Sequence, residues 1–334
     1  MYVRYMTEAP PFRITPKMLD LVIDITRAMD RIEGYEVLDR NPRLRRRNRV
    51  RSIHSSCAIE ANSLSSSQVS AILDGRRVEG PKKDINEVKG AYEAYSSLDS
   101  VDPYDISDLL RMHRVMTNGT VEGAGMFRTT GEGVFSGDKA IFIAPPPDLV
   151  PSHMENLFGW MSENKGTMNP LILSSVFHYE MVFIHPFSDG NGRMARFWQT
   201  AILGDWNELF RWIPIENGIH KSQKGYYEAI QASNDAGEST VFIEFMLETI
   251  LRSLTDAEFE IEEMSEDMPS GIRRLMESMD ANRTYSSREL MELVSARSGP
   301  SFRRDCLGPA LERGLIVMTD PNSPKSPRQR YRLA

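Results

Sequence analysis

Apolar residues recur every three or four positions along most of the chain, and this spacing predicts a mainly α-helical protein. The first helical segment begins at Thr15–Pro16, where proline is tolerated in the first turn. In residues 104–118 we expect Asp105 or Ser107 to open a helix. His113 on that helix lacks a second metal ligand at a suitable spacing, so we expect it to serve packing or polar contacts. The same spacing returns in residues 66–97, 150–165, 216–234 and 241–254.

Two apolar runs flank the segment His185 to Arg196, which reads HPFSDGNGRMAR and combines a histidine, a carboxylate, a Gly-rich turn and two arginines. The run from Leu171 to Ile184 is long enough for a buried helix, and the run from Ala195 to Leu203 indicates another. The pattern therefore predicts a helix–loop–helix junction at this segment.

Residues 123–147 are the least helical part of the chain. The sequence FRTTGEGVFSGDKAIFIAPPP alternates around Ser136–Gly137–Asp138, which predicts a β-hairpin. A dinucleotide fingerprint is excluded here, because the third position after Gly123 and Gly125 is occupied by Arg128.

The C-terminal part differs from the rest in charge. Residues 270–334 contain 11 Arg and 1 Lys against 7 acidic residues, a net charge of +5, whereas the whole chain carries −7. Three helical segments, the strand IVMTD, a turn and the strand RQRYRL predict a winged helix-turn-helix, preceded by an acidic linker at 255–269. Arg303 and Arg304 are the obvious DNA contacts, so DNA binding and protein docking both stay open, with docking favoured.

Composition places the 334-residue chain among soluble globular proteins, with 40% hydrophobic and 26% charged residues. No apolar run is long enough for a membrane span, and the N-terminus lacks a signal-peptide core, so we expect a cytoplasmic protein without membrane partners. Cys57 and Cys306 stand far apart without a CxxC partner, which argues against a disulfide framework or a zinc site. Six arginines in 42–51 indicate either a nucleic-acid patch or, as Leu44 and Val50 favour, a helix with a solvated basic face.

The residues of the junction indicate phosphate chemistry. Backbone N–H groups of a Gly190–Asn191–Gly192 turn ahead of a helix N-terminus can cradle an anion. Arg193 and Arg196, three residues apart, can lie beside that cradle and hold a di- or triphosphate. Asp189 is placed to bind Mg²⁺ together with phosphate oxygens, and His185 can accept a proton near neutral pH. We therefore expect transfer of part of a nucleotide to a nucleophile that His185 deprotonates.

HPFSDGNGRMAR resembles the signature of Fic-domain proteins, HPFx(D/E)GNGRxxR, at every specified position. The resemblance implies that His185 activates a Ser, Thr or Tyr hydroxyl, which attacks the α-phosphate of ATP, leaves AMP on the target and releases pyrophosphate. By position it also implies roles for the other motif residues: Asp189 as the Mg²⁺ ligand, Gly190, Asn191 and Gly192 as the anion hole, Arg193 at the β-phosphate, Arg196 at the γ-phosphate and Phe187 as a buried anchor.

SIHSSCAIEANSLS resembles the inhibitory helix of the same family, (S/T)xxxE(G/N), with Ser56 and Glu60 in the specified places. The resemblance implies that Glu60 pairs with Arg196 and occupies the γ-phosphate position. Ala61 departs from the pattern, because the polar residue that could end the helix, Asn62, stands one position later. We expect a helix end delayed by one residue that leaves Glu60 in place.

Two further features take a role from the resemblance. The hairpin would be a flap that aligns a target segment along its edge, against the alternative of a structural hairpin; its predicted docking residues are Val134, Phe135, Ile141 and Phe142. Tyr226 and Tyr227 in GYYEAIQ would border the adenine pocket, against the alternative that they are core residues.

These expectations combine into a mainly α protein with a Fic-type helical core, a β-hairpin flap and a C-terminal winged helix-turn-helix. We expect a helical region at 1–103 with the inhibitory helix at about 44–61, a catalytic core at 104–254, the linker at 255–269 and the winged helix at 270–334. The expected function is AMP transfer from Mg-ATP to a target protein or to the chain itself, with homodimer formation left open. The alternatives are removal of AMP at the same site and a DNA-binding regulator whose Fic site senses nucleotide.

Overall fold

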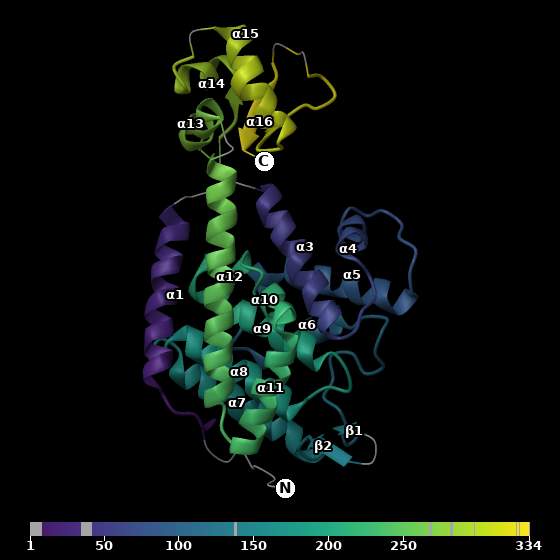
Figure 1. Ribbon diagram of the computed structural model, residues 1–334. Coiled ribbons are helices and arrows are strands. Elements are labelled where there is room, and N and C mark those ends of the chain that lie inside the picture. Colours follow the sequence, from purple (N-terminus) through teal and green to yellow (C-terminus); the bar gives the residue numbers. More distant parts are fainter. Residues whose placement is uncertain are drawn as a thin grey trace. The chain divides into compact units, whose positions relative to one another are not determined.

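A computed structural model describes residues 9–34, 42–136, 139–266, 269–280, 283–296, 298–324, 326 and 328–333; the side chains at 33–34, 134–136, 139–141, 263–266 and 277 lie outside the description. The prediction of a mainly helical protein is confirmed (Figure 1). Chain contacts define two compact units, Met1–Arg27 with Asn48–Ser253, and Ala28–Arg47 with Leu254–Ala334. None of the helices in the described ranges combines the length and apolar character that a membrane crossing requires.

The first unit is built almost entirely from helices. Its elements are α4 (Ser66–Leu73), α5 (Lys82–Ser96), η1 (Leu98–Ser100), α6 (Ile106–Met116), β1 (Gly133–Ser136), β2 (Lys139–Ile143), η2 (Pro147–Leu149), α7 (Val150–Asn164), α8 (Pro170–Ile184), α9 (Asn191–Trp206), η3 (Glu208–Arg211), α10 (Ile215–Lys221) and α11 (Gln223–Ala236). Three longer helices begin or end in it: α1 (Pro16–Gly34), α3 (Pro42–Ile59) and α12 (Thr240–Glu266).

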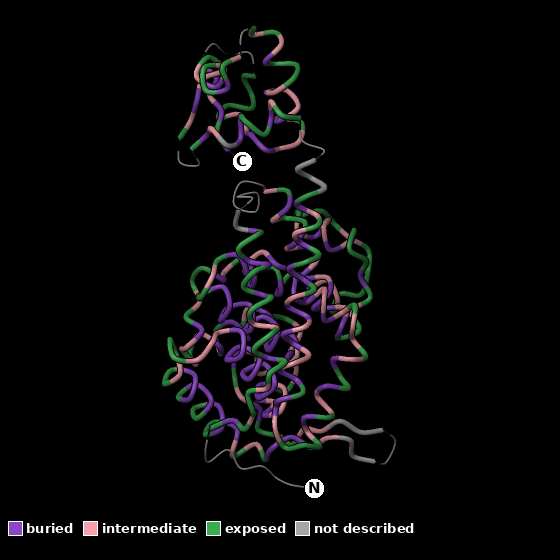
Figure 2. The backbone as a smooth tube through the Cα atoms, turned by 60° about the vertical axis from the view of Figure 1, so that its left-hand side comes forward, coloured by how far each residue is buried: buried purple, intermediate pink, exposed green. Residues whose placement is uncertain are grey.

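Helices α8 and α9 form the centre of this unit. Almost every residue of α8 is buried, as expected for a helix that is apolar on all sides. Helix α9 is buried along most of its length and packs against α8, and buried positions gather in the same interior in Figure 2. The predicted helix–loop–helix junction is confirmed, and its loop is held by two rigid, buried elements.

Local sequence signals explain several helix ends. The prediction that a helix starts at Thr15–Pro16 is confirmed, since α1 begins at Pro16. Asp105 caps α6 by accepting the Ser107 N–H, which decides between the two predicted starts. Asn169 caps α8 in the same way through the Leu171 N–H. The loop at 185–190 is therefore approached by helices with well-defined ends.

Strands β1 and β2 pair antiparallel as the alternation predicts, with Gly133 opposite Ile143 and Ser136 opposite Lys139. A register shift between Val134 and Phe135 bends the ladder. The predicted turn at 137–138 lies outside the described residues.

Helix α12 runs further than the sequence predicts, through most of the segment expected to be a linker. Ala257 and Ile261 are buried, so the acidic segment still has an apolar face. Two ion pairs offset the repulsion between its carboxylates, Arg31 with Glu258 and Arg47 with Glu260. These partners come from residues far away in the chain, which the local acidic composition does not reveal.

The second unit holds a small sheet and short helices around its own apolar core. Its elements beyond α12 are α13 (Ser270–Ser278), β3 (Tyr285–Ser286), α14 (Ser287–Leu293), α15 (Gly299–Phe302), a π-helical turn η4 (Arg303–Leu307), α16 (Gly308–Glu312), β4 (Ile316–Met318) and β5 (Arg330–Leu333). The strands pair antiparallel in the order β3-β5-β4.

Candidate active site

The loop between α8 and α9 changes direction at two left-handed residues. His185 ends α8 with φ 52° while its N–H still bonds to the Met181 carbonyl. Gly190 precedes α9 with φ 84°, and a Cβ there would lie 2.9 Å from Cγ2 of Thr117. At position 190, only glycine can adopt this positive φ and also leave room for the Thr117 side chain without strain. The loop therefore delivers its N–H groups to the start of α9, as an anion cradle requires.

Asn191 closes the loop through its side chain. Its Oδ1 accepts the Phe187 N–H at 2.9 Å, and its Nδ2 donates to the Phe187 carbonyl at 2.7 Å. The Phe187 side chain is fully buried, which fits its predicted role as an anchor. The amide thus fixes the loop from inside, in addition to the backbone role expected from its place in the turn.

His113 supports the same loop from α6. Its ring stacks on Phe187 with the centroids 3.7 Å apart. Nδ1 accepts the Gly125 N–H at 2.8 Å, so the neutral ring carries its proton on Nε2 and donates it to the Asp189 carbonyl at 3.0 Å. Burial lowers the pKa of His113 to about 4, which keeps the ring neutral. The polar contacts expected for His113 therefore hold the motif loop.

Arg128 is a site residue that the sequence reasoning missed. It is buried, and its Nε donates to the His185 carbonyl at 2.7 Å while its own N–H donates to the Pro186 carbonyl at 2.9 Å. Its Nη2 donates to the Pro145 carbonyl at 2.6 Å. Arg128 ties the start of the loop to the segment that follows the hairpin. In the sequence, the only local feature that could have marked Arg128 as a site residue is its place in a Gly- and Thr-rich segment.

His185 lies at the mouth of the loop in a partly buried position. Burial lowers the pKa of its imidazole, and the nearby Arg128 charge acts in the same direction. The ring is therefore neutral at neutral pH and can accept a proton.

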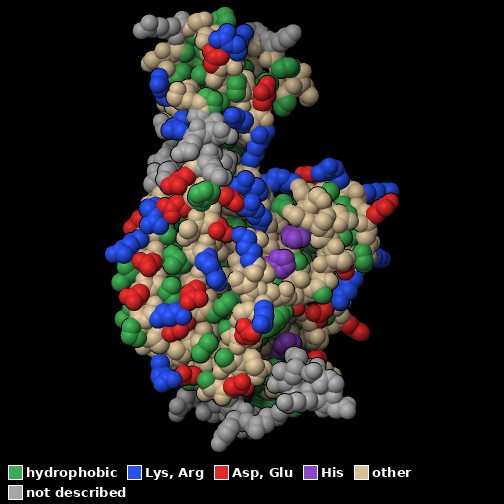
Figure 3. All heavy atoms as spheres, in the orientation of Figure 1, with side chains coloured by type: hydrophobic (Ala, Val, Ile, Leu, Met, Phe, Trp, Pro, Cys, Tyr) green, Lys and Arg blue, Asp and Glu red, His purple; other side chains and the backbone are tan. Residues whose placement is uncertain are grey.

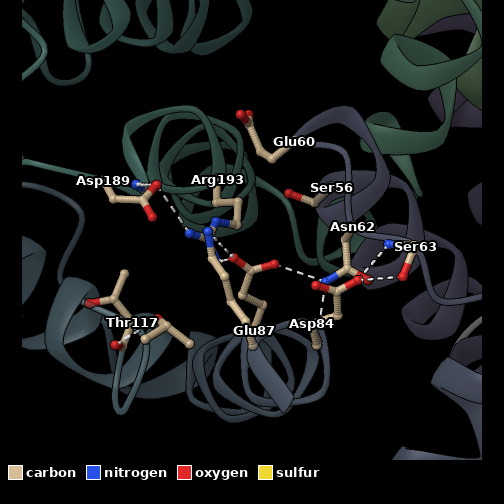
Figure 4. Close-up of polar contacts among 12 residues, drawn as sticks. Ser56, Glu60, Asn62, Ser63, Asp84, Glu87, Thr117, Asp189 and Arg193 are labelled. Carbon is tan, nitrogen blue, oxygen red and sulfur yellow. Dashed lines mark hydrogen bonds and ion pairs between the residues drawn. The ribbon is translucent and has the colours of Figure 1, made fainter. Parts of the chain in front are cut away.

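The two motif arginines project from the first turns of α9 and are both about 2% exposed. Nη2 of Arg193 lies 3.5 Å from Asp189, and its Nη1 lies 3.6 Å from Glu87 of α5 (Figure 4). Neither Nε nor Nη1 of Arg193 has a hydrogen-bond partner. A buried cation with unused donors is costly, so this guanidinium is prepared for an anionic ligand.

Arg196 binds the end of α3. Its Nε donates to Oγ of Ser56 at 3.1 Å, and its Nη2 donates to the Ser56 carbonyl at 2.9 Å and to Glu60 at 2.8 Å. Burial disfavours the guanidinium, but the Glu60 carboxylate, together with Tyr226 and Tyr95, raises the pKa of Arg196. Ser56, Glu60 and Arg196, predicted from segments far apart in the sequence, thus meet at one point.

The Glu60 carboxylate also covers the cradle. A Cβ placed on Gly192 would lie 2.2 Å from Oε1 of Glu60 and 3.1 Å from Nη1 of Arg196. Glycine at position 192 therefore lets an anion come close to the start of α9. In this structure the anion at that place is Glu60.

The expectation of a delayed helix end at Asn62 is wrong. Helix α3 ends at Ile59, and the left-handed residue is Ala61 itself, with φ 62°. The Asn62 N–H reaches back to the Cys57 carbonyl at 3.2 Å, as in a helix C-cap. A left-handed alanine costs roughly 1–2 kcal/mol. Glu60 keeps its predicted place, but in a strained turn.

We expect Ala61→Gly to stabilise the protein by roughly 1 kcal/mol, because glycine adopts this φ without strain. Urea denaturation would measure the change. The matched control is Ala58→Gly inside α3, which should destabilise by roughly 1 kcal/mol. A loss of stability in both variants would contradict the strain at Ala61.

The two tyrosines of α11 differ in exposure. Tyr226 is buried, and its hydroxyl lies 2.9 Å from Nε2 of His178. Tyr227 is 48% exposed, and its hydroxyl lies 3.4 Å from the Ile59 carbonyl at the end of α3. Tyr226 has the surroundings of a core residue, whereas Tyr227 is half exposed beside the Glu60 turn.

The predicted docking residues of the hairpin are only partly described. The Phe142 ring lies 5.7 Å from the Phe183 ring, centroid to centroid, so β2 packs on the end of α8. The side chains of Val134, Phe135 and Ile141 lie outside the described residues.

Asp189 is the one motif carboxylate near the cradle. Its side chain is 46% exposed, and its Oδ1 accepts the Gly190 N–H at 2.6 Å. No group of three or more His, Cys, Asp or Glu residues within the described ranges could hold a metal ion without other ligands. A single half-exposed carboxylate fits Mg²⁺, which commonly takes one or two protein carboxylates and fills its shell with phosphate oxygens and water.

Comparisons with known proteins agree with this geometry. Residues 103–203 match the Fic/DOC family, and residues 270–334 match the C-terminal domain described as Filamentation induced by cAMP protein Fic-like. A crystal structure of a Fic family protein from Desulfovibrio desulfuricans G20 is 38% identical with a TM-score of 0.72, and the match covers 98% of each chain. Fic-1 from Caenorhabditis elegans, residues 134–508, is 24% identical with a TM-score of 0.58, over 74% of this chain and 75% of that one.

Several relatives are named protein adenylyltransferase. Protein adenylyltransferase fic-1 from Caenorhabditis elegans is 27% identical over 85% of this chain, and protein adenylyltransferase Fic from Nematostella vectensis is 30% identical over 60% of it. The chain spans 54% and 47% of the lengths of these two relatives, respectively.

Proposed function

Because this chain belongs to the Fic family, we propose that it is a protein adenylyltransferase, which moves AMP from Mg-ATP to a Ser, Thr or Tyr hydroxyl of a target protein. The buried Arg193 guanidinium beside a glycine cradle, in which Nε and Nη1 make no hydrogen bond, is the observation that carries the proposal. The names of the relatives support AMP as the transferred group.

In the proposed reaction, the target oxygen attacks the α-phosphorus and the bond from that phosphorus to the bridging oxygen of the β-phosphate breaks. The hydroxyl proton moves to His185, which Arg128 holds in position through the backbone. Pyrophosphate leaves with the negative charge, which Arg193 and the loop N–H groups stabilise. Asp189 would hold Mg²⁺, which offsets phosphate charge when bound. Tyr227, which is half exposed, is the proposed neighbour of the adenine.

We also propose that Glu60 inhibits the transfer. It occupies the cradle and pairs with Arg196, so a γ-phosphate and Glu60 compete for one guanidinium. Automodification follows the same chemistry when the acceptor hydroxyl belongs to the chain itself. Hairpin β1–β2 is proposed to receive the target segment along its edge.

Labelled nucleotides test the reaction type. Protein incubated with ATP labelled at the α-phosphorus should become radioactive, and protein incubated with ATP labelled at the γ-phosphorus should not. Labelling from the γ-position alone would show phosphate transfer and reject AMP transfer.

The pH dependence follows from the lowered pKa of His185. The base acts in its neutral form, and a lowered pKa preserves that form to lower pH. We therefore expect kcat/KM to fall on the acid side with a midpoint below the ordinary histidine pKa of about 6.5. A profile of kcat/KM between pH 5 and 8 would show it, and a midpoint above about 7 would contradict the burial of the ring.

Removal of AMP is a second candidate at the same site, because the Glu60 carboxylate at the cradle could orient an attacking water. A preparation of AMP-modified target distinguishes the two: a hydrolase releases free AMP without added pyrophosphate, and loses this activity in Glu60→Gly.

For residues 270–334 we propose protein docking and not DNA binding. Arg304 is bound by Asp305 at 2.7 and 2.8 Å, and Arg330 by Thr284 and Glu289. Basic side chains on the face drawn in Figure 3 are scattered over this unit and form no continuous stripe. A gel shift with random duplex at low salt should show no complex; a salt-sensitive complex would favour the DNA-binding regulator.

A further inference from the structure

The turn that carries Glu60 is tied to the first two turns of α5. Asp84 accepts the Ser63 N–H at 2.8 Å and the Ser63 hydroxyl at 2.5 Å. Nδ2 of Asn62 donates to the Asp84 carbonyl at 3.1 Å and to Oε2 of Glu87 at 2.8 Å. Figure 4 shows these contacts as one chain of polar groups.

The orientation of the Asn62 amide is fixed by its partners. Both Nδ2 bonds go to groups that only accept, while Oδ1 accepts the Leu64 N–H at 3.2 Å. A reversed amide would face the Glu87 carboxylate with an oxygen. Asn62 therefore acts as a donor to Glu87.

Glu87 has a second partner on the other side of its carboxylate. The group is buried, and Oε1 lies 3.6 Å from Nη1 of Arg193. Among the residues that the structure describes, the other cation near this carboxylate is Lys83, which is 3.8 Å away and 65% exposed. A buried carboxylate must be paired, and Glu87 achieves this with Arg193 and Asn62 together.

We propose that Glu87 is a positioning residue that serves two groups at once, holding the Arg193 guanidinium at the cradle and, through Asn62, the turn that carries Glu60. This proposal rests on the proposed function, because that function places Arg193 at the β-phosphate. Alanine disfavours the left-handed backbone at position 61, so the contacts with α5 add needed support to the turn's own Asn62 N–H bond to the Cys57 carbonyl. Glu87 thereby connects the inhibitory element with the first phosphate-binding arginine, independently of the Glu60–Arg196 pair.

Asn62→Asp tests the connection to the turn. It replaces a donor by a carboxylate of the same shape against the Glu87 carboxylate, and the repulsion should displace the turn and raise AMP transfer about tenfold with Glu60 intact. Adding Glu87→Gln supplies a donor from the opposite side and restores the turn, so transfer measured at saturating ATP should fall back to the wild-type rate or below it. Failure of Asn62→Asp to raise transfer, in a protein that Glu60→Gly activates, overturns the proposal.

Hydrogen exchange measures the stability of the Glu60 turn independently of catalytic activity. Amide exchange at residues 60–64 should be faster in Asn62→Asp and return to the wild-type rate in the double variant. If Glu60→Gly shows no transfer, the proposed function fails, and the exchange rates still decide whether Glu87 holds the turn. Unchanged exchange in Asn62→Asp overturns the proposal.

Nucleotide affinity tests the connection to Arg193. In the Glu60→Gly background, Glu87→Gln should raise the Kd for ATP about fivefold because the guanidinium loses its charged anchor, and should leave the Kd for AMP, which lacks a β-phosphate, within about twofold. Glu93→Gln on the exposed side of α5 is the matched control. Equal changes for ATP and AMP, or no change for either, overturn the positioning role.

Discussion

Replacing His185 is expected to lower AMP transfer by about 100- to 10,000-fold, the usual contribution of a general base. His185 is left-handed, so His185→Asn is the more informative variant, because asparagine tolerates this conformation better than alanine. Transfer is measured with ATP labelled at the α-phosphorus, in the Glu60→Gly background so that the starting rate is high.

The control for His185→Asn is nucleotide affinity. Neither Arg193 nor the cradle is touched, so the Kd for ATP should stay within about twofold of the parent value. Loss of transfer together with loss of ATP binding would show a disturbed loop. Full transfer in His185→Asn would show that another group accepts the proton.

Glu60→Gly is expected to raise AMP transfer about 10- to 100-fold. The substitution removes a carboxylate that bonds to Arg196 at 2.8 Å and covers Gly192. A hydrogen bond between charged groups is strong enough that its loss would raise, by that factor, the fraction of protein in which Arg196 is available to the γ-phosphate. Initial rates at saturating ATP, with matched protein concentrations, provide the measurement.

Glu60→Gln serves as the matched variant. It keeps the size of the side chain and one acceptor for Arg196 but loses the charge, so its rate should lie between those of the wild type and Glu60→Gly. If all three rates agree while labelling still depends on His185, Glu60 does not inhibit and the catalytic assignment stands alone.

The loop from His185 to Arg196 could be predicted because its chemistry is contiguous in sequence. A turn with two glycines, a helix start and arginines three apart are local features whose geometry follows from residue spacing. The pairing of Glu60 with Arg196 needed the family resemblance, since the two residues are 136 positions apart.

The supports of the loop could not be predicted in the same way. Arg128 reaches the His185 carbonyl across 57 positions, and His113 reaches the Asp189 carbonyl across 76. Both contacts end on backbone carbonyls, which every residue possesses, so no side-chain pattern marks them. Glu87 looks like an ordinary helix residue until Arg193 and Asn62 are placed around it.

Two differences between expectation and structure have the same cause. The turn at Ala61 was expected one residue later because the polar residue that could end the helix is Asn62. Residues 255–269 were expected to form a linker because they are acidic and end in Met–Pro. In both places, hydrogen bonds or ion pairs from distant segments outweigh the local preference: Asp84 and Glu87 hold the turn, and Arg31 and Arg47 hold α12.

The central claim is that this site transfers AMP to a protein hydroxyl. Mass spectrometry of peptides from a cell extract incubated with the Glu60→Gly variant and ATP tests it most directly. The account predicts peptides that carry adenosine and one phosphate on Ser, Thr or Tyr, absent when His185 is also replaced by Asn. Peptides that carry phosphate alone, in the same His185-dependent manner, would contradict it.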